Sequence, residues 1–205
     1  MKGMRKAKGL TFIELMIVLV IVAISVSVGV PMMKSTVNGN RLSAQTNELL
    51  AALSLARSEA IKRATRVTVC RSSTAGATDN AATPTPSCAT SGGWDAGWIV
   101  FVDDNGNGTV DATDGNGVRN ASEPLVFART GPLAGRNTLA LAPASGTDTS
   151  RVTFTGDGIT SNSTGAGVFT LCDFSRSRYG TQITINITGR AQVIKLAPPS
   201  NTTLC

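Results

Sequence analysis

The feature that most constrains this chain is an uncharged apolar run near its N-terminus. The nineteen residues from Leu15 to Met33 include no charged side chain. As a helix, they span about 30 Å, which is the thickness of the hydrocarbon core of a bilayer. The preceding residues carry four cations: Lys2, Arg5, Lys6 and Lys8. The positive-inside rule then places the remainder of the chain outside the cytoplasm.

A carboxylate, Glu14, lies at the start of this apolar run. A charge there is costly in a membrane, so a functional role is expected for it. An ordinary secretory signal has its small-residue cleavage site after the apolar stretch. Here Gly9 follows the cations directly and stands before both Glu14 and the apolar run.

The stretch Gly9-Leu10-Thr11-Phe12-Ile13-Glu14-Leu15 resembles the prepilin signal of type IV pilins and type II secretion pseudopilins. The resemblance implies that a prepilin peptidase cleaves after Gly9 and that the apolar segment stays on the mature protein. Leu10 is then the N-methylated first residue, where most family members have Phe. The family also places the Glu14 carboxylate against the N-terminus of a neighbouring subunit in a filament. Because a buried amine and carboxylate cost less when paired, Glu14 would select the assembly register.

Composition limits what the rest of the chain can do. The formal net charge of +6 falls to +2 once the four cations before Gly9 are removed, which gives no case for nucleic-acid binding by charge alone. The chain has no histidine, so the usual catalytic triads cannot form and no enzyme activity is expected. We expect a leader at 1–9, a transmembrane and assembly helix at 10–33, an amphipathic half of the stem at 34–66, and a periplasmic β-rich domain at 67–205.

Residues 41 to 66 have a helical pattern, because small and apolar residues recur at spacings of three and four. These residues are Leu42, Thr46, Leu49, Leu53, Ala56, Ala60 and Ala64. We expect this face to pack on a sheet, with close approach of the strands at the alanines. Pro31 and the sequence Asn38-Gly39-Asn40 predict a bent or locally melted stem rather than a domain boundary.

The remaining predicted elements are strands of a mainly antiparallel sheet. They are Arg66–Arg71, Trp94–Val102, Glu123–Ala128, Thr138–Ala142, Val152–Thr155, Gly167–Asp173, Gln182–Thr188 and Ala191–Leu196. The fold class is therefore α+β: a long N-terminal helix, membrane-embedded in its first half, packed on an antiparallel β-sheet domain. Leu53–Arg63 followed by Val67–Cys70, and Gly97–Asp103, resemble the FimT/FimU and GspH type of minor pilins and pseudopilins.

The chain has four cysteines, which predicts disulfides outside the cytoplasm. Three pairings are possible. We favour the two that join nearest neighbours, Cys70–Cys88 and Cys172–Cys205, each stabilising the fold by about 3–4 kcal/mol in the chain-entropy model. A metal site is a weaker alternative, because no Cys-x-x-Cys pair is present.

One segment has the oxygen spacing of an EF-hand calcium loop. Its candidate ligands are Asp103, Asn105, Asn107, Thr109, Asp111 and Asp114, with glycine at the sixth position. Two amides replace carboxylates, and Asp114 stands where a bidentate glutamate is usual. The alternative is a hairpin tip whose side chains satisfy their own backbone. Calcium is the one cofactor considered, and any binding would be weak.

Basic residues cluster towards the end of the sequence: Arg176, Arg178, Arg190 and Lys195, with Tyr179 among them. Arginine beside an aromatic residue can hold phosphate and stack on a base. Some FimT-like minor pilins bind DNA through a Gly-Arg-x-Arg motif. Here the match is Gly189-Arg190-Ala191-Gln192, without the second arginine. The alternative is a solvated strand face.

The resemblance implies a structural function. The first reading is a minor pilin of a type IV pilus, serving assembly, motility, adhesion or DNA uptake. The alternative is an H-type pseudopilin of type II secretion. The predicted disulfides favour the pilus. Either way we expect a single-pass inner-membrane protein, with other pilins or pseudopilins and the prepilin peptidase as partners and DNA as a further one.

Overall fold

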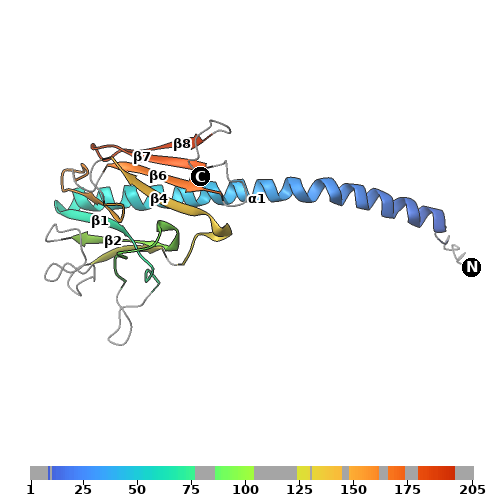
Figure 1. The fold of residues 1–205 in the computed structure, drawn as a ribbon, viewed down its shortest axis with the longest axis horizontal. Helices are drawn as coiled ribbons and strands as arrows, with labels where there is room; N and C mark the ends of the chain where they lie inside the picture. The colour runs from blue at the N-terminus through green and yellow to red at the C-terminus, as the bar shows by residue number, and fades with distance from the viewer. Residues whose placement is uncertain are drawn as a thin grey trace, which may run out of the picture. The chain divides into compact units, whose positions relative to one another are not determined.

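The structure is a computed structural model that describes residues 9, 11–76, 86–103, 124–129, 131–144, 148–161, 166–173 and 180–196. The chain divides into two compact units, Met1–Asn40 and Arg41–Cys205, which we take in turn. A long helix, α1 (Phe12–Arg63), begins in the first unit and ends in the second (Figure 1).

Helix α1 contains the whole predicted apolar run and continues through Pro31 and Gly39. The predicted alternative of local melting at Asn38–Asn40 is therefore wrong. The prediction that no domain boundary falls here is also wrong, because the two compact units divide between Asn40 and Arg41. A glycine in a helix costs only about 1 kcal/mol, which is less than opening several backbone hydrogen bonds would cost. Proline is also tolerated in helices suited to a membrane, where neighbouring groups can satisfy the freed carbonyl.

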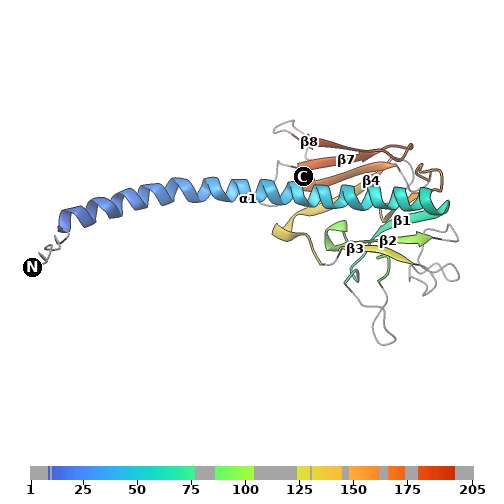
Figure 2. The same ribbon diagram turned by 180° about the vertical axis from the view of Figure 1, so that it is seen from behind.

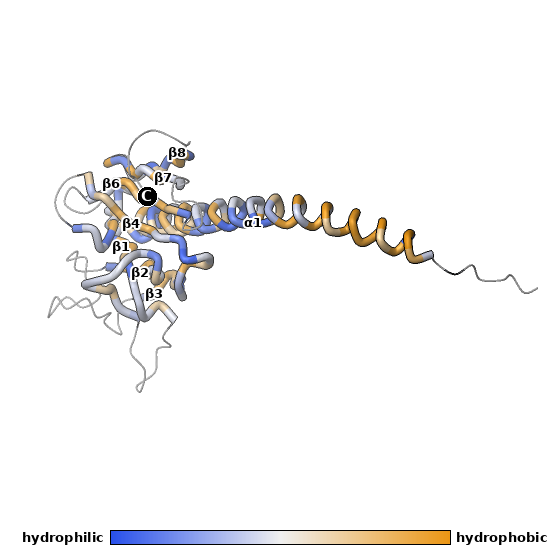
Figure 3. Tube along the Cα trace, turned by 45° about the vertical axis from the view of Figure 1, so that its right-hand side comes forward, coloured by the Kyte–Doolittle hydropathy of each residue, from blue (hydrophilic) through white to orange (hydrophobic). Residues whose placement is uncertain are grey.

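In the first unit, every side chain from Phe12 to Met33 is exposed. Figure 3 shows this part of α1 as almost continuously hydrophobic. The helix is long and apolar enough to cross a membrane, by length and composition. The hydroxyls of Ser25 and Ser27 donate to the backbone oxygens of Ile21 and Ile24, each at 2.8 Å. These polar atoms are satisfied within the helix, as an apolar environment requires.

The second unit contains two antiparallel four-stranded sheets (Figures 1 and 2). One has the order β3-β2-β1-β5, and the other has the order β4-β6-β7-β8. The strands are β1 (Arg66–Arg71), β2 (Trp98–Asp103), β3 (Leu125–Arg129), β4 (Thr138–Pro143), β5 (Arg151–Phe154), β6 (Gly167–Cys172), β7 (Gly180–Ile185) and β8 (Ala191–Leu196). Short 3₁₀ helices are η1 (Trp94–Ala96) and η2 (Ala134–Arg136). This arrangement confirms the predicted fold class.

Two predicted strands differ from the observed ones by three residues or more at an end. The segment from Trp94 forms η1, and β2 starts only at Trp98, because Gly97 lies between them with φ +140. A Cβ at Gly97 would lie 2.7 Å from the backbone oxygen of Arg129. Strand β7 ends at Ile185, because Asn186 starts a turn in which its side-chain oxygen accepts from the backbone N–H of Arg190 at 3.1 Å.

One face of α1 packs in a single core with residues of both sheets. Its most buried side chains are Leu49, Ala52, Leu53, Ala56 and Ala60, each at most 2% exposed. They share a cluster with Val67, Val69, Val100, Leu139, Val152, Phe154, Phe169, Leu171, Ile183 and Ile185. The prediction that this helix face packs on a sheet is confirmed. The close approach of strands at the alanines stays a prediction. The predicted Ala64 is instead exposed, because the helix has ended before it.

Aromatic side chains connect η1 to the second sheet. Trp94 is 1% exposed, and its ring meets Phe169 of β6 edge to face, with centroids 4.8 Å apart. Its indole N–H donates to the backbone oxygen of Thr149 at 2.8 Å. Because a buried indole needs a hydrogen-bond acceptor, this contact fixes η1 in place.

Polar contacts also hold α1 against the loops. Gln45 is buried, and its amide donates to the backbone oxygen of Ala134 at 2.9 Å and accepts from Asn137 at 2.8 Å. Glu48 pairs with Arg129 at 3.0 Å, and the Arg129 guanidinium lies 5.1 Å from the centre of the Trp98 ring. These contacts tie the helix to η2 and β3.

The C-terminal end of α1 has a Schellman motif. The N–H of Thr65 donates to the oxygen of Ala60, and that of Ala64 to the oxygen of Ile61, both at 3.3 Å. Ala64 therefore adopts a positive φ of 51°, which favours glycine. Gly156 packs beside this turn, since a Cβ there would lie 2.7 Å from the carbonyl carbon of Ala64.

We predict that Ala64→Gly raises the free energy of unfolding by about 1 kcal/mol, because it relieves the left-handed conformation. The measurement is thermal or urea unfolding of the protein in detergent micelles. Ala60→Gly is the control: it lies in the helix interior, so it should lower stability by about 1 kcal/mol or more. Equal destabilisation by both changes would contradict the assignment of this cap.

Asp148 and its neighbours give the domain a pH-dependent contribution to stability. Burial acts to raise the pKa of Asp148, but hydrogen bonds from Ser150 and the charge of Arg151 outweigh it. The pKa of Asp148 is thus lowered from its ordinary value of 3.8. A lowered folded-state pKa stabilises the fold above pH 3.8, and this stabilisation is lost as the pH falls through the folded-state pKa.

We predict that Asp148→Asn lowers the melting temperature at pH 7 and makes it less sensitive to acid. Between pH 7 and about pH 2.5, the melting temperature of the wild type should fall further than that of the variant. The control is Asp157→Asn, at an exposed turn residue. If acid lowers the melting temperature of Asp148→Asn as much as that of the wild type, this carboxylate does not contribute to the pH dependence of stability.

Candidate functional site

The predicted processing site lies just before α1. Gly9 is exposed and outside the helix, and Leu10 is outside the described residues. Thr11 caps the helix: its hydroxyl oxygen accepts from the N–H of Glu14 at 3.3 Å, and its backbone oxygen accepts from that of Leu15 at 3.2 Å. Threonine is favoured at this position because it satisfies an unpaired N–H of the first turn. The helix therefore starts at Phe12, three residues after Gly9.

The Glu14 carboxylate lies in the first turn of α1 and is exposed. Acidic side chains are favoured there by the positive end of the helix dipole. In the part of the chain that the structure describes, no hydrogen bond or ion pair is recorded for this carboxylate. Glu14 can therefore accept a cationic partner from outside the chain, as the predicted assembly role requires.

The structure confirms the predicted disulfide between Cys70 and Cys88, which are 18 residues apart. Cys70 lies in β1 and is 0% exposed, in a small core with Ala75, Ile99 and Phe101. This core lies on the face of the first sheet opposite to α1. Cys172 is also disulfide-bonded. Its predicted partner, Cys205, lies outside the described residues.

Of the predicted calcium ligands, Asp103 alone lies within the described residues. It ends β2, is 0% exposed, and accepts a hydrogen bond from the hydroxyl of Thr68 at 3.2 Å. Asn105, Asn107, Thr109, Asp111 and Asp114 lie outside the described residues. Calcium binding therefore stays a prediction. One carboxylate oxygen of Asp103, the first predicted ligand, already accepts a hydrogen bond from Thr68 of β1.

Of the four predicted DNA-binding cations, two lie within the described residues. Arg190 and Lys195 are exposed, in the turn before β8 and in β8 itself. Arg176 and Arg178 lie outside the described residues. Gly189, which would begin the Gly-Arg-x-Arg match, has a structural role: φ is +73, and a Cβ there would lie 2.2 Å from the oxygen of Gly158. DNA binding stays a prediction.

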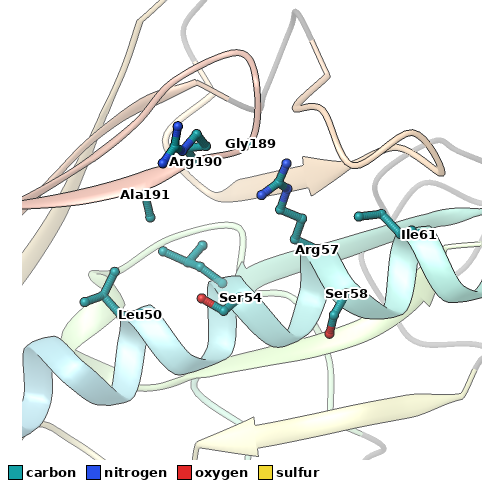
Figure 4. A pocket seen from close by; sticks show the side chains of 9 residues that line it. Leu50, Ser54, Arg57, Ser58, Ile61, Gly189, Arg190 and Ala191 are labelled. Carbon is teal, nitrogen blue, oxygen red and sulfur yellow. The ribbon is translucent and has the colours of Figure 1, made fainter.

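Sequence reasoning missed a groove between α1 and the turn that leads into β8 (Figure 4). Its volume is about 340 Å³. It is lined by Leu50, Leu53, Ser54, Arg57, Ser58, Ile61, Gly189, Arg190 and Ala191. The sequence signal that could have indicated this groove is Arg57. It is a charged residue beside the small and apolar face of the helix, and its side chain is half-buried.

Arg57 extends from α1 to the turns above it (Figure 4). Its Nε donates to the backbone oxygen of Gly158 at 2.8 Å, and one terminal nitrogen donates to that of Thr188 at 3.1 Å. Both acceptors are neutral backbone carbonyls, so neither is a counter-charge for the guanidinium.

The sequence model of a family described as type II transport protein GspH matches residues 45–189, which is well over half of the chain. The chain belongs to the GspH family. A second model, described as a prokaryotic N-terminal methylation motif, matches residues 4–30. The matched GspH region begins at the buried Gln45 and includes both sheets up to the β7–β8 turn. The methylation motif includes Gly9 and Glu14, and the two matches together confirm the predicted pilin-like family.

One solved structure supports the fold of this GspH-family chain. It is similar to a crystal structure of the type IV minor pilin FimU from Pseudomonas aeruginosa strain PAO1, at 19% identity and a TM-score of 0.51. The match covers 76% of this chain and 89% of FimU. A second crystal form of FimU matches at 18% identity and a TM-score of 0.48, over 75% and 92% of the two chains. Curated protein sequences gave no match.

We predict that replacing both Cys70 and Cys88 by alanine lowers the free energy of unfolding by about 3 kcal/mol, from the loss of an 18-residue cross-link. Urea unfolding in detergent micelles measures the change. The control is Ser73→Ala, a nearby substitution outside the strands, which should leave stability within about 0.5 kcal/mol. A double variant as stable as the wild type would contradict the contribution of this disulfide.

Proposed function

We propose that the protein is a minor pilin-like subunit that is cleaved after Gly9, anchored in the inner membrane by α1, and assembled with other pilins into a filament. The match of residues 4–30 to the N-terminal methylation motif carries this proposal. The apolar first part of α1 supports it, because no side chain from Phe12 to Met33 is buried within the chain. Lipid or neighbouring subunits would cover this surface.

Cleavage gives Leu10 a new α-amine, four residues before Glu14 in the sequence. The carboxylate of one subunit can then pair with the amine of its neighbour. Each group is costly alone in an apolar surrounding, and pairing removes most of that cost. Since a shifted register separates the two charges, the pair would specify how far one helix slides along another.

The filament is a type IV pilus or a type II secretion pseudopilus. The family description names type II transport, whereas the structural relative is named a type IV minor pilin. We favour the pilus, because the domain is cross-linked by disulfides, as suits a part exposed outside the cell. Loss of surface motility on gene deletion, with normal enzyme secretion, would support the pilus. The opposite pattern would assign the pseudopilus.

We predict that Glu14→Ala reduces incorporation of the protein into sheared filaments about tenfold or more, because the neighbour's amine is left without its partner. The measurement is the ratio of filament-bound to membrane-bound protein. Glu14→Asp, which keeps the charge, should retain part of the incorporation.

The matched control is Thr11→Ala. It weakens the helix cap by about 1 kcal/mol but keeps the carboxylate. Normal incorporation of Glu14→Ala would overturn the proposed assembly role. Detection of uncleaved protein in the wild type would overturn processing at Gly9.

A further inference from the structure

Two arginines and no acidic side chain are among the described residues that line the groove between α1 and the β7–β8 turn. Arg57 and Arg190 both line it, and none of its nine lining residues is acidic. The structure records no ion pair for either arginine in its described part. Elsewhere in the same domain, Arg63, Arg129 and Arg151 pair with carboxylates, whereas Arg71 donates to backbone oxygens as Arg57 does. The groove is distinguished by having two arginines in its lining.

Hydrogen-bonding capacity remains at Arg57. A guanidinium has five N–H donors, and Arg57 uses two of them on the carbonyls of Gly158 and Thr188. These two contacts hold the side chain in one orientation. The remaining donors are therefore positioned in advance, which lowers the entropic cost of binding.

The position of Arg190 depends on the close packing of two turns. Gly189 approaches Gly158 so closely that a Cβ on it would lie 2.2 Å from the Gly158 oxygen and 3.0 Å from Nε of Arg57. The backbone N–H of Arg190 donates to the side chain of Asn186 at 3.1 Å, which fixes the turn. Figure 4 shows Arg190 at the β-turn side of the groove and Arg57 at the helix side.

The other side chains that line the groove are apolar or carry a small hydroxyl group. Leu50, Leu53, Ile61 and Ala191 line it, with the hydroxyls of Ser54 and Ser58 at the helix. Ile61 is 51% exposed. Such walls suit the hydrocarbon stem of an acidic side chain and an apolar neighbour beside it, whereas the arginines suit its carboxylate.

We propose that this groove binds an acidic side chain, flanked by apolar residues, from a neighbouring pilin-like subunit of the filament. Charge complementarity argues for this occupant: the groove has two arginines and no acidic residue in its lining, and arginine binds carboxylates in two-pronged geometry. The inference rests on the proposed function, since it needs a filament in which subunits are neighbours.

A phosphate of DNA is the competing occupant. DNA is bound through many phosphate contacts spread along an extended cationic surface. Here the cations converge on one groove with apolar walls, and the side chains after Gly9 carry a formal charge of only +2. The groove therefore fits one carboxylate with an apolar neighbour better than a nucleic-acid backbone.

The test uses the full chain in its own bacterium, with a photo-crosslinking amino acid in place of Ser54, which lines the groove. We expect a crosslink to another filament subunit, at a peptide that contains Asp or Glu beside apolar residues. Arg190→Glu should reduce the crosslink about tenfold or more, the ratio expected for losing a hydrogen bond to a charged group. Changing the partner's acid to lysine should restore it.

Lys195→Glu is the matched control, because it makes the same charge change on the exposed strand β8 outside the groove. It should leave the crosslink unchanged, and Arg190→Lys should retain part of it. Unaltered melting temperatures of the variants show that folding is intact.

Three results would overturn the groove proposal: no crosslink in filaments that contain the protein, equal effects of Arg190→Glu and Lys195→Glu, or lost DNA binding in Arg190→Glu with an unchanged crosslink. Glu14→Ala separates the two proposals. If it blocks incorporation while Arg190→Glu leaves the crosslink intact, the groove proposal alone fails. If the wild-type protein is absent from filaments, the proposed function fails, and the groove proposal with it.

Discussion

Packing of α1 against both sheets is the constraint on which the second unit depends. Ala52, Ala56 and Ala60 are at most 2% exposed, and they belong to a hydrophobic core that includes residues of both sheets. One helix face therefore supplies part of the core that holds the two sheets together. Glycine is favoured in the turn beside the helix end because Gly158 has a φ of +74.

Much of this fold follows from periodicity. The helical spacing of Leu49, Leu53, Ala56 and Ala60 predicts the buried face of α1, and alternation predicts the strands to within a few residues. Local backbone geometry accounts for the differences between the predicted and the observed ends of strands. Gly97 separates η1 from β2, and the side chain of Asn186 closes a turn where a strand was expected to continue. The expected melting near Gly39 overestimated the effect of one glycine.

Contacts between distant segments could not be predicted in this way. Gln45 is polar on a buried helix face, and its partners, Ala134 and Asn137, are about ninety residues away. The groove could not be predicted for the same reason, because Arg57 and Arg190 line it together only when the β7–β8 turn packs over α1. The N-terminal methylation motif was predictable, since Gly9 and Glu14 are close in sequence. The hydrogen bond of Asp103 to Thr68 was not predictable, because it forms only when β1 pairs with β2.

The exposed apolar surface of α1 has a consequence for reversibility. Under the proposed function, side chains such as Ile17, Leu19 and Ile21 leave lipid for contact with other helices. Both surroundings are apolar, so the hydrophobic effect hardly distinguishes them. The balance between stored and assembled subunits would then rest on packing and on the one carboxylate. Such a helix can be inserted, withdrawn and returned with little net change in solvation, which suits a structure that is built and dismantled repeatedly.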